Sequence, residues 1–110
     1  MNCNIKLLAN FIKEVKKLSK KYKKIGDDLK ELQNELLANP KSGIHLGNNC
    51  YKIRVANTSI PSGKSGGFRV IYYYLDANSV IYLMSIYAKS DLENISDERI
   101  LEILQESGIS

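Results

Sequence analysis

Four of the sixteen cationic residues of this chain are concentrated in one stretch, Tyr51 to Arg69, with the sequence YKIRVANTSIPSGKSGGFR. Lys52 and Arg54 are two positions apart, and because side chains alternate along a β-strand, both leave the same face of a sheet. Lys64 follows on a glycine-rich loop, and Arg69 begins the next apolar run. Ammonium and guanidinium groups held close together bind phosphate oxygens. The stretch therefore predicts a surface that binds a polyanion.

The composition is typical of a single globular domain over residues 1–110. Of the 110 residues, 44% are apolar and 25% are charged, so the chain is neither disordered nor membrane-embedded. No apolar run is long enough to span a bilayer, and the first ten residues lack the apolar core of an export signal, so we expect a cytoplasmic protein. Cys3 and Cys50 have no metal-ligand spacing with the lone His45, which predicts reduced thiols, no metal and no cofactor.

Charge is distributed unevenly along the chain. Residues 1–24 hold eight lysines and one glutamate, whereas residues 90–110 hold six acids and one arginine. The positive part of such a chain attracts nucleic acid, and the negative C-terminal part is repelled by it. This pattern favours a protein that presents one side to RNA or DNA.

The first half of the chain predicts a strand followed by two helices. A short strand is expected at Cys3–Leu7, and Asn10 is the expected N-cap of a helix from Phe11 to about Lys23. Apolar residues recur at helical spacing again from Ile25, and this second helix should end before Pro40, because the residue before a proline disfavours the α region. A short connection makes the two helices an antiparallel hairpin.

From Cys50 onward the apolar period changes from 3.6 to 2, which is typical of strands. Residues 51–55 have one apolar and one cationic face, whereas residues 68–75 and 80–86 are apolar on both faces, as central strands would be. Ser96 is expected to cap a last helix. The order β-α-α-β-β-β-α predicts an α+β fold, in which an N-terminal helical hairpin packs on a small antiparallel sheet and a C-terminal helix lies near its edge.

Four segments follow the lysine-rich hairpin: LGNNCYKIRVA, GKSGGFRVIYYY, VIYLMSIYAKSD and ENISDERILEIL. In this order they resemble the RelE/ParE superfamily of type II toxin-antitoxin toxins, specifically its RelE/HigB-like branch, and the similarity extends from Asn4 to Leu104. The resemblance implies a toxin that enters the ribosomal A site, cuts mRNA without a metal and inhibits translation. It also implies a cognate antitoxin that holds the toxin inactive in a hetero-oligomer.

The resemblance also assigns four catalytic positions. Lys52 and Arg54 match the two cations of the family's YKIK-type strand, and Arg69 matches the arginine that begins the next strand. Lys89 lies where RelE has an arginine near the end of the last strand. RelE has a tyrosine a few residues further on, which matches Ile95 or one of its neighbours in this chain, and none of these is a tyrosine.

RNA carries its own nucleophile, the ribose 2′-hydroxyl, so cleavage without a metal needs alignment, two proton transfers and stabilisation of charge at phosphorus. Arg54 and Arg69 suit phosphate binding, and Lys64 on its loop could close over the RNA. Lys52 is the candidate base, because nearby cations and partial burial favour the neutral form of an amine. Lys89 is the candidate acid or a second phosphate donor.

Further residues are candidates for RNA binding. Tyr73 and Tyr87 could stack on bases or replace the missing tyrosine, although core packing is the expected role of most tyrosines in the chain. Lys16 and Lys20 on the first helix could contact ribosomal RNA through their charge, or they could form an ordinary solvated face.

Two other interpretations stay open: a ParE-like inhibitor of DNA gyrase, and a homologue that binds the ribosome or its antitoxin without cutting RNA. The cations on the strands favour the nuclease, while the missing tyrosine leaves the non-catalytic homologue open. A phosphate-binding P-loop is excluded, because the Gly63–Ser65 segment is followed by a predicted strand and Thr58 stands where the motif needs glycine.

Overall fold

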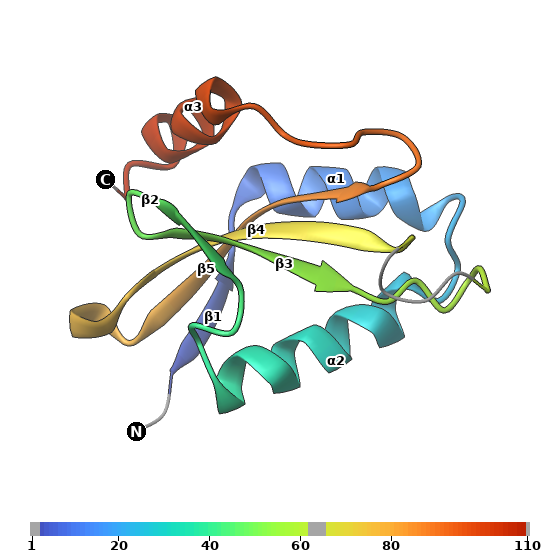
Figure 1. Ribbon diagram of the computed structural model, residues 1–110, viewed down its shortest axis with the longest axis horizontal. Helices are drawn as coiled ribbons and strands as arrows, with labels where there is room; N and C mark the ends of the chain where they lie inside the picture. The colour runs from blue at the N-terminus through green and yellow to red at the C-terminus, as the bar shows by residue number, and fades with distance from the viewer. Residues whose placement is uncertain (1–2, 62–65, 110) are drawn as a thin grey trace.

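The computed structural model describes residues 3–61 and 66–109, which form a five-stranded sheet with three helices (Figure 1). The elements are, in chain order, β1 (Asn4–Leu7), α1 (Ala9–Ser19), α2 (Ile25–Ala38), β2 (Ile44–Gly47), β3 (Cys50–Val55), β4 (Phe68–Leu75), a 3₁₀ turn (Asp76–Asn78), β5 (Val80–Ala88) and α3 (Asp97–Ser107). The strand order in the sheet is β1-β5-β4-β3-β2, so β4 lies at its centre.

The predicted α+β RelE-like fold is confirmed, and the sheet differs from the expectation in two details. An additional strand, β2, forms an edge beside β3, so His45 lies in a strand and its ring centroid is 5.0 Å from that of Tyr51. At the other edge β1 runs parallel to β5, which makes the sheet mixed instead of purely antiparallel. The four residues of β2 are too few to show a period of two in the sequence.

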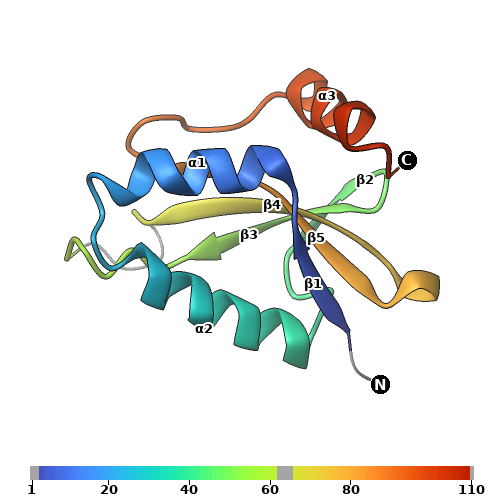
Figure 2. The same ribbon diagram turned by 180° about the vertical axis from the view of Figure 1, so that it is seen from behind.

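The two faces of the sheet are covered by different helices (Figures 1 and 2). On one face, α1 and α2 bury Phe11, Leu32 and Leu36 against the strands. On the other face α3 closes a second, smaller core. This second core contains Cys50, Ile71, Tyr73, Met84, Tyr87, Ile100, Ile103 and Leu104.

The helix starts agree only in part with the sequence prediction. The N-cap of α1 is Leu8, with no side-chain hydrogen bond, so the prediction that Asn10 caps this helix is wrong. Asn10 lies inside the first turn, where its amide donates to Oε1 of Glu14 at 2.9 Å. Ser96 caps α3 as predicted, because its Oγ accepts the backbone N–H of Arg99.

Candidate active site

Lys52, Arg54, Arg69 and Lys89 line one pocket of about 170 Å³ on the side of the sheet that carries α3. The side chains come from β3, from the start of β4 and from the residue after β5, so positions far apart in the chain share one site. The pocket is also lined by Ile44, Glu93 and Asn94.

Strand register explains why the cations meet. The apolar residues that alternate with Lys52 and Arg54 on β3 belong to the core beneath α1 and α2, so the two cations point the other way. Arg69 stands directly opposite Arg54 on one side and Tyr87 on the other. Opposite residues in an antiparallel pair have Cβ atoms about 4.5–5.5 Å apart, so the three side chains form a row across the sheet.

A bulge in β5 brings Tyr87 and Lys89 to this face. Consecutive residues of β4 pair with Ser85 and then with Leu83, so β5 contains one extra residue at this point. A shift of one residue moves all following side chains to the opposite face of a strand. Without the bulge, Tyr87 and Lys89 would point toward α1 and away from the pocket.

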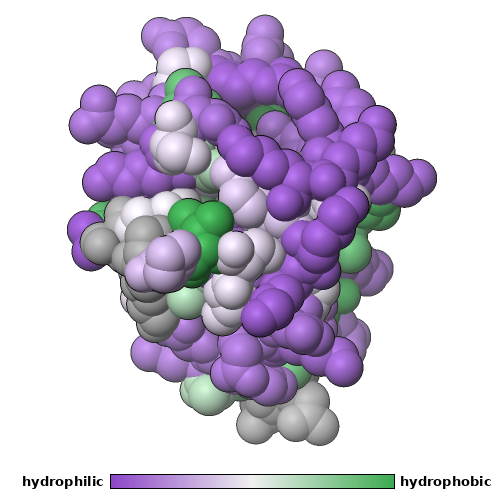
Figure 3. All heavy atoms as spheres, turned by 90° about the vertical axis from the view of Figure 1, so that its right-hand side faces the viewer, coloured by the Kyte–Doolittle hydropathy of each residue, from purple (hydrophilic) through white to green (hydrophobic). Residues whose placement is uncertain are grey.

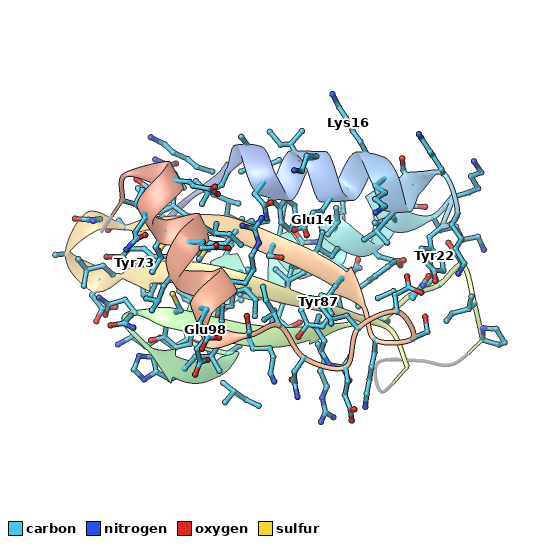
Figure 4. The ribbon with its side chains drawn as sticks, turned by 90° about the horizontal axis from the view of Figure 1, so that it is seen from above. Glu14, Lys16, Tyr22, Tyr73, Tyr87 and Glu98 are labelled. Atoms are coloured by element: carbon cyan, nitrogen blue, oxygen red, sulfur yellow. The ribbon has the colours of Figure 1, made fainter. Side chains whose placement is uncertain are left out.

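Glu14 of α1 holds the bulge in place. Its Oε1 accepts the Ser85 hydroxyl at 2.8 Å and the backbone N–H of Ile86 at 3.2 Å. Figure 4 shows Glu14 between α1 and the sheet. The carboxylate therefore supplies the acceptor that a bulged backbone N–H lacks in the ladder.

Arg69 is the buried member of the cationic cluster, with 5% of its surface exposed. Its Nη1 donates to the carbonyl of Phe68 at 3.2 Å. Burial, and then the positive charge of Arg54, lower the pKa of the guanidinium below its ordinary value, while Tyr87 acts in the opposite direction. Arginine nevertheless stays charged in proteins. A charge with this little water around it interacts strongly with an anion that enters the pocket.

The segment between β5 and α3 forms one wall of the pocket. The backbone N–H of Lys89 donates to the carbonyl of Gly67 at 3.0 Å, which extends the β4–β5 contact by one residue. Further along, the amide oxygen of Asn94 accepts a hydrogen bond from Nζ of Lys52 at 3.0 Å. Glu93, beside Asn94, is the one acid among the described residues of the lining.

The described residues contain neither a metal-ligand cluster nor a membrane-spanning helix. Within residues 3–61 and 66–109, no three side chains of His, Cys, Asp or Glu lie close enough together to hold a metal ion. In the same part of the chain, every helix is too short or too polar to cross a bilayer.

A protein-family model described as the RelE toxin of the RelE / RelB toxin-antitoxin system matches residues 9–108 of this chain. The chain belongs to the RelE family. It is therefore a RelE-family toxin of a toxin-antitoxin system.

Solved structures of E. coli RelE share the fold of this RelE-family chain. Free RelE with two arginine-to-alanine substitutions is 22% identical, with 98% of this chain and 96% of that chain covered and a TM-score of 0.59. The same mutant bound to a RelBc antitoxin peptide is 22% identical, with 93% and 94% covered and a TM-score of 0.60. The intact RelBE complex is 24% identical, with 78% and 95% covered and a TM-score of 0.58.

The tyrosines predicted to contact RNA are enclosed in the RelE-like fold. Tyr73 is 6% exposed beneath α3, with its ring centroid 6.2 Å from that of Tyr82. Tyr87 is 7% exposed, and its buried hydroxyl has no hydrogen-bond partner among the described residues, although the Ile95 backbone lies nearby. Burial raises the pKa of the Tyr87 phenol, and Ile95 and Arg69 oppose this effect. Base stacking by Tyr73 and Tyr87 is therefore not supported by this arrangement.

Of the three lysines predicted to bind RNA outside the strands, the two on described residues, Lys16 and Lys20, do not line the pocket. Lys16 on α1 and Lys20, the C-cap that follows it, are both exposed, and α1 covers the opposite face of the sheet. Figure 4 shows Lys16 projecting away from the ribbon. The end of the molecule that carries the α1–α2 connection is largely hydrophilic (Figure 3). Lys64 lies outside the described residues.

Three polar residues that form or support the site are not predicted by the sequence patterns. Glu93 and Asn94 belong to the segment ENISDERILEIL, which by itself predicts only the last helix and its cap at Ser96. An acid and an amide directly after a strand that ends in Lys89 were the available signal. For Glu14 no signal existed, because nothing in the sequence relates it to Ser85.

Proposed function

We propose that this RelE-family toxin is a ribosome-dependent mRNA endonuclease that acts without a metal and thereby inhibits translation. The observation that carries the proposal is the grouping of Lys52, Arg54, Arg69 and Lys89 in one pocket. Four cations in a small polar pocket suit a sugar-phosphate segment far better than an apolar ligand. They also suit a transition state with extra negative charge on phosphate oxygens.

In the proposed reaction the ribose 2′-hydroxyl gives its proton to a basic group of the site as its oxygen attacks the adjacent phosphorus, while the bond from phosphorus to the 5′-oxygen breaks. The products are a 2′,3′-cyclic phosphate and a 5′-hydroxyl. Arg54 and Arg69 bind the phosphate oxygens, and loss of one such fixed donor lowers a rate about 10²- to 10³-fold. The Lys89 ammonium protonates the leaving 5′-oxygen. The ribosome holds the mRNA in an attack geometry, which is worth about 7–11 kcal/mol.

A cognate antitoxin is the proposed protein partner. In two of the similar structures, E. coli RelE is bound to RelB or to a RelBc peptide. For this chain, an acidic and partly disordered antitoxin segment that folds on binding would complement the cationic pocket. The proposed assembly is a cytoplasmic hetero-oligomer of toxin and antitoxin.

The test is to express the chain without antitoxin and to map 5′ ends on translated and untranslated copies of one mRNA. We expect cuts with 5′-hydroxyl ends in the translated copy alone. Most cleavage should be lost in each of three variants, Lys52→Ala, Arg54→Ala and Lys89→Ala. At the buried position Arg69, the substitution Arg69→Lys removes the guanidinium but keeps a long cationic side chain, so it tests the role of the guanidinium with little loss of packing. Lys30→Ala, an exposed lysine of α2 outside the pocket lining, is the control and should cut normally.

Other results would replace the proposal. Intact mRNA together with trapped gyrase–DNA breaks would indicate a gyrase inhibitor. Intact mRNA with the toxin still bound to ribosomes would indicate a homologue without catalytic activity. Equal cutting of translated and untranslated copies would remove the dependence on the ribosome.

A further inference from the structure

The pocket contains one carboxylate to which neither the resemblance nor the family match gives a role. Glu93 lies on the segment between β5 and α3 and lines the pocket together with the four cations. Its side chain is exposed, and no hydrogen bond or ion pair holds it within residues 3–61 and 66–109. A negative charge at this position weakens phosphate binding, so its presence calls for another explanation.

Proton transfer provides that explanation. Cleavage through the 2′-hydroxyl requires a group that accepts its proton. Arginine is not deprotonated in proteins, and a lysine amine carries its proton at neutral pH, so the four cations are poor acceptors. An ionised carboxylate has no proton to donate, so it can only accept one. Glu93 is therefore the charged group of the described lining that is ready to take a proton.

Lys52, the base expected from the sequence, is less suitable. Its Nζ donates to the amide oxygen of Asn94 at 3.0 Å, which holds the amine against the pocket wall. The position of Lys52 fits a phosphate donor better than a proton acceptor.

We propose that Glu93 is the general base of the cleavage reaction, an inference that rests on the proposed function. Its carboxylate takes the proton of the 2′-hydroxyl as the bond from the 2′-oxygen to phosphorus forms. The bond from phosphorus to the 5′-oxygen breaks, and the Lys89 ammonium protonates that oxygen. Glu93 then holds one additional proton and Lys89 lacks one, so transfer between them through water restores both groups. The step requires no further reactant.

The experiment measures single-turnover cleavage of an A-site codon on programmed ribosomes by the whole toxin, with Glu93→Gln compared to Asp91→Asn. Glutamine keeps the size of the side chain but does not accept the proton. Asp91 is an exposed acid on the same segment and outside the pocket lining, so its variant controls for the change in net charge. We expect Glu93→Gln to lower the rate about 10²- to 10⁴-fold without weaker ribosome binding, and Asp91→Asn to cleave at the wild-type rate.

The pH dependence separates a base from a residue that only shapes the pocket. The charged groups that share the lining with Glu93 are all cationic: Lys52, Arg54, Arg69 and Lys89. With a carboxylate base, the wild-type rate should fall in acid as the carboxylate is protonated. The Glu93→Gln protein should lack this fall, because it has no carboxylate at that position.

Several outcomes would overturn the assignment. Glu93→Gln that cleaves as fast as wild type, or faster, would show that Glu93 only moderates the positive charge, and the proposed function would stand. An equal loss in Asp91→Asn would show a general effect of net charge. If the cleavage rate of Glu93→Gln fell at low pH in the same way as the wild-type rate, the base would be another group. Wild-type toxin that leaves ribosome-bound mRNA intact would overturn both the assignment and the proposed function.

Discussion

Arg54 and Arg69 stand directly opposite each other on β3 and β4, with both side chains in the same pocket. Like charges in this position repel, and the positive charge of Arg54 adds to the effect of burial in lowering the pKa of the Arg69 guanidinium. The arrangement lowers the stability of the free protein. It is expected where the pair serves to bind an anion.

Substitution of Arg54 should therefore stabilise the fold while it weakens cleavage. Because the charges lie directly opposite, we expect Arg54→Gln to raise the free energy of unfolding by about 0.2–1 kcal/mol. The gain should shrink at high salt, since Arg54 is exposed and its charge is screened. Urea unfolding at low and high ionic strength measures the gain in the free energy of unfolding and its decrease with salt. Lys30→Gln on α2 is the control, and a gain of the same size there would contradict the explanation.

Glu14 should be needed for the bulge that directs Lys89 to the pocket. Glu14→Ala leaves the Ser85 hydroxyl and the Ile86 N–H without their acceptor, so we expect the free energy of unfolding to fall by about 1–3 kcal/mol. Hydrogen exchange at the Ile86 amide should become faster. Glu31→Ala, an exposed acid on α2, should leave both unchanged. Normal protection of Ile86 in Glu14→Ala would show that the bulge forms without the carboxylate.

Gly43 should not tolerate a side chain. A Cβ atom there would lie 2.8 Å from the carbonyl oxygen of Lys52 and 3.0 Å from the Tyr72 hydroxyl, which donates to Pro40 at 2.8 Å. We expect Gly43→Ala to lower the free energy of unfolding by about 1–3 kcal/mol.

A second glycine provides the matched control for Gly43. Gly26 lies in α2 with open space around its Cβ position, so Gly26→Ala should raise the free energy of unfolding by about 0.5–1 kcal/mol. Thermal and urea unfolding of the two variants give the comparison. If both substitutions changed the free energy of unfolding by a similar amount, the residues around Gly43 would be able to move aside for the added Cβ atom without loss of stability.

The elements of this fold were predictable where one physical signal dominated. The alternation of residues 51–55 gave both the strand and its cationic face, and the apolar runs on β4 and β5 gave the central strands. Ser96, followed by two acids, gave the start of α3. In each case the signal lies within a few neighbouring residues.

The features that were missed depend on contacts between distant residues. The β5 bulge has no local signature, because both faces of that strand are apolar, so the direction of Tyr87 could not be derived from the sequence. Asn10 has the residue type of a cap, but its side chain instead bonds Glu14 and the Met84 carbonyl. Glu93 joins the pocket because a segment without regular structure returns along the sheet. Local patterns contain none of this information.

The Cys50 thiol should make the protein sensitive to alkaline pH. Burial raises the pKa of this thiol from 9.0 to about 11, with Sγ 3.9 Å from the Met84 sulfur. A raised pKa in the folded state means that the stabilising contribution is complete below the unfolded value and is lost as the pH rises toward 11. Between pH 8 and pH 10.5, wild type should lose roughly 1–2 kcal/mol more free energy of unfolding than Cys50→Ala.

Comparing the two proteins isolates the thiol, because the buried tyrosines with raised pKa values, Tyr72 and Tyr87, are present in both. Urea unfolding at the two pH values gives the difference. Thiol labelling of the folded protein at pH 8 should modify Cys3, which is partly exposed, much faster than Cys50, since the thiolate is the reacting species and burial disfavours it. Two results would show that the second core, which α3 closes, does not shield the Cys50 thiol. One is labelling of the two cysteines at the same rate, and the other is an equal loss of the free energy of unfolding in wild type and Cys50→Ala between the two pH values.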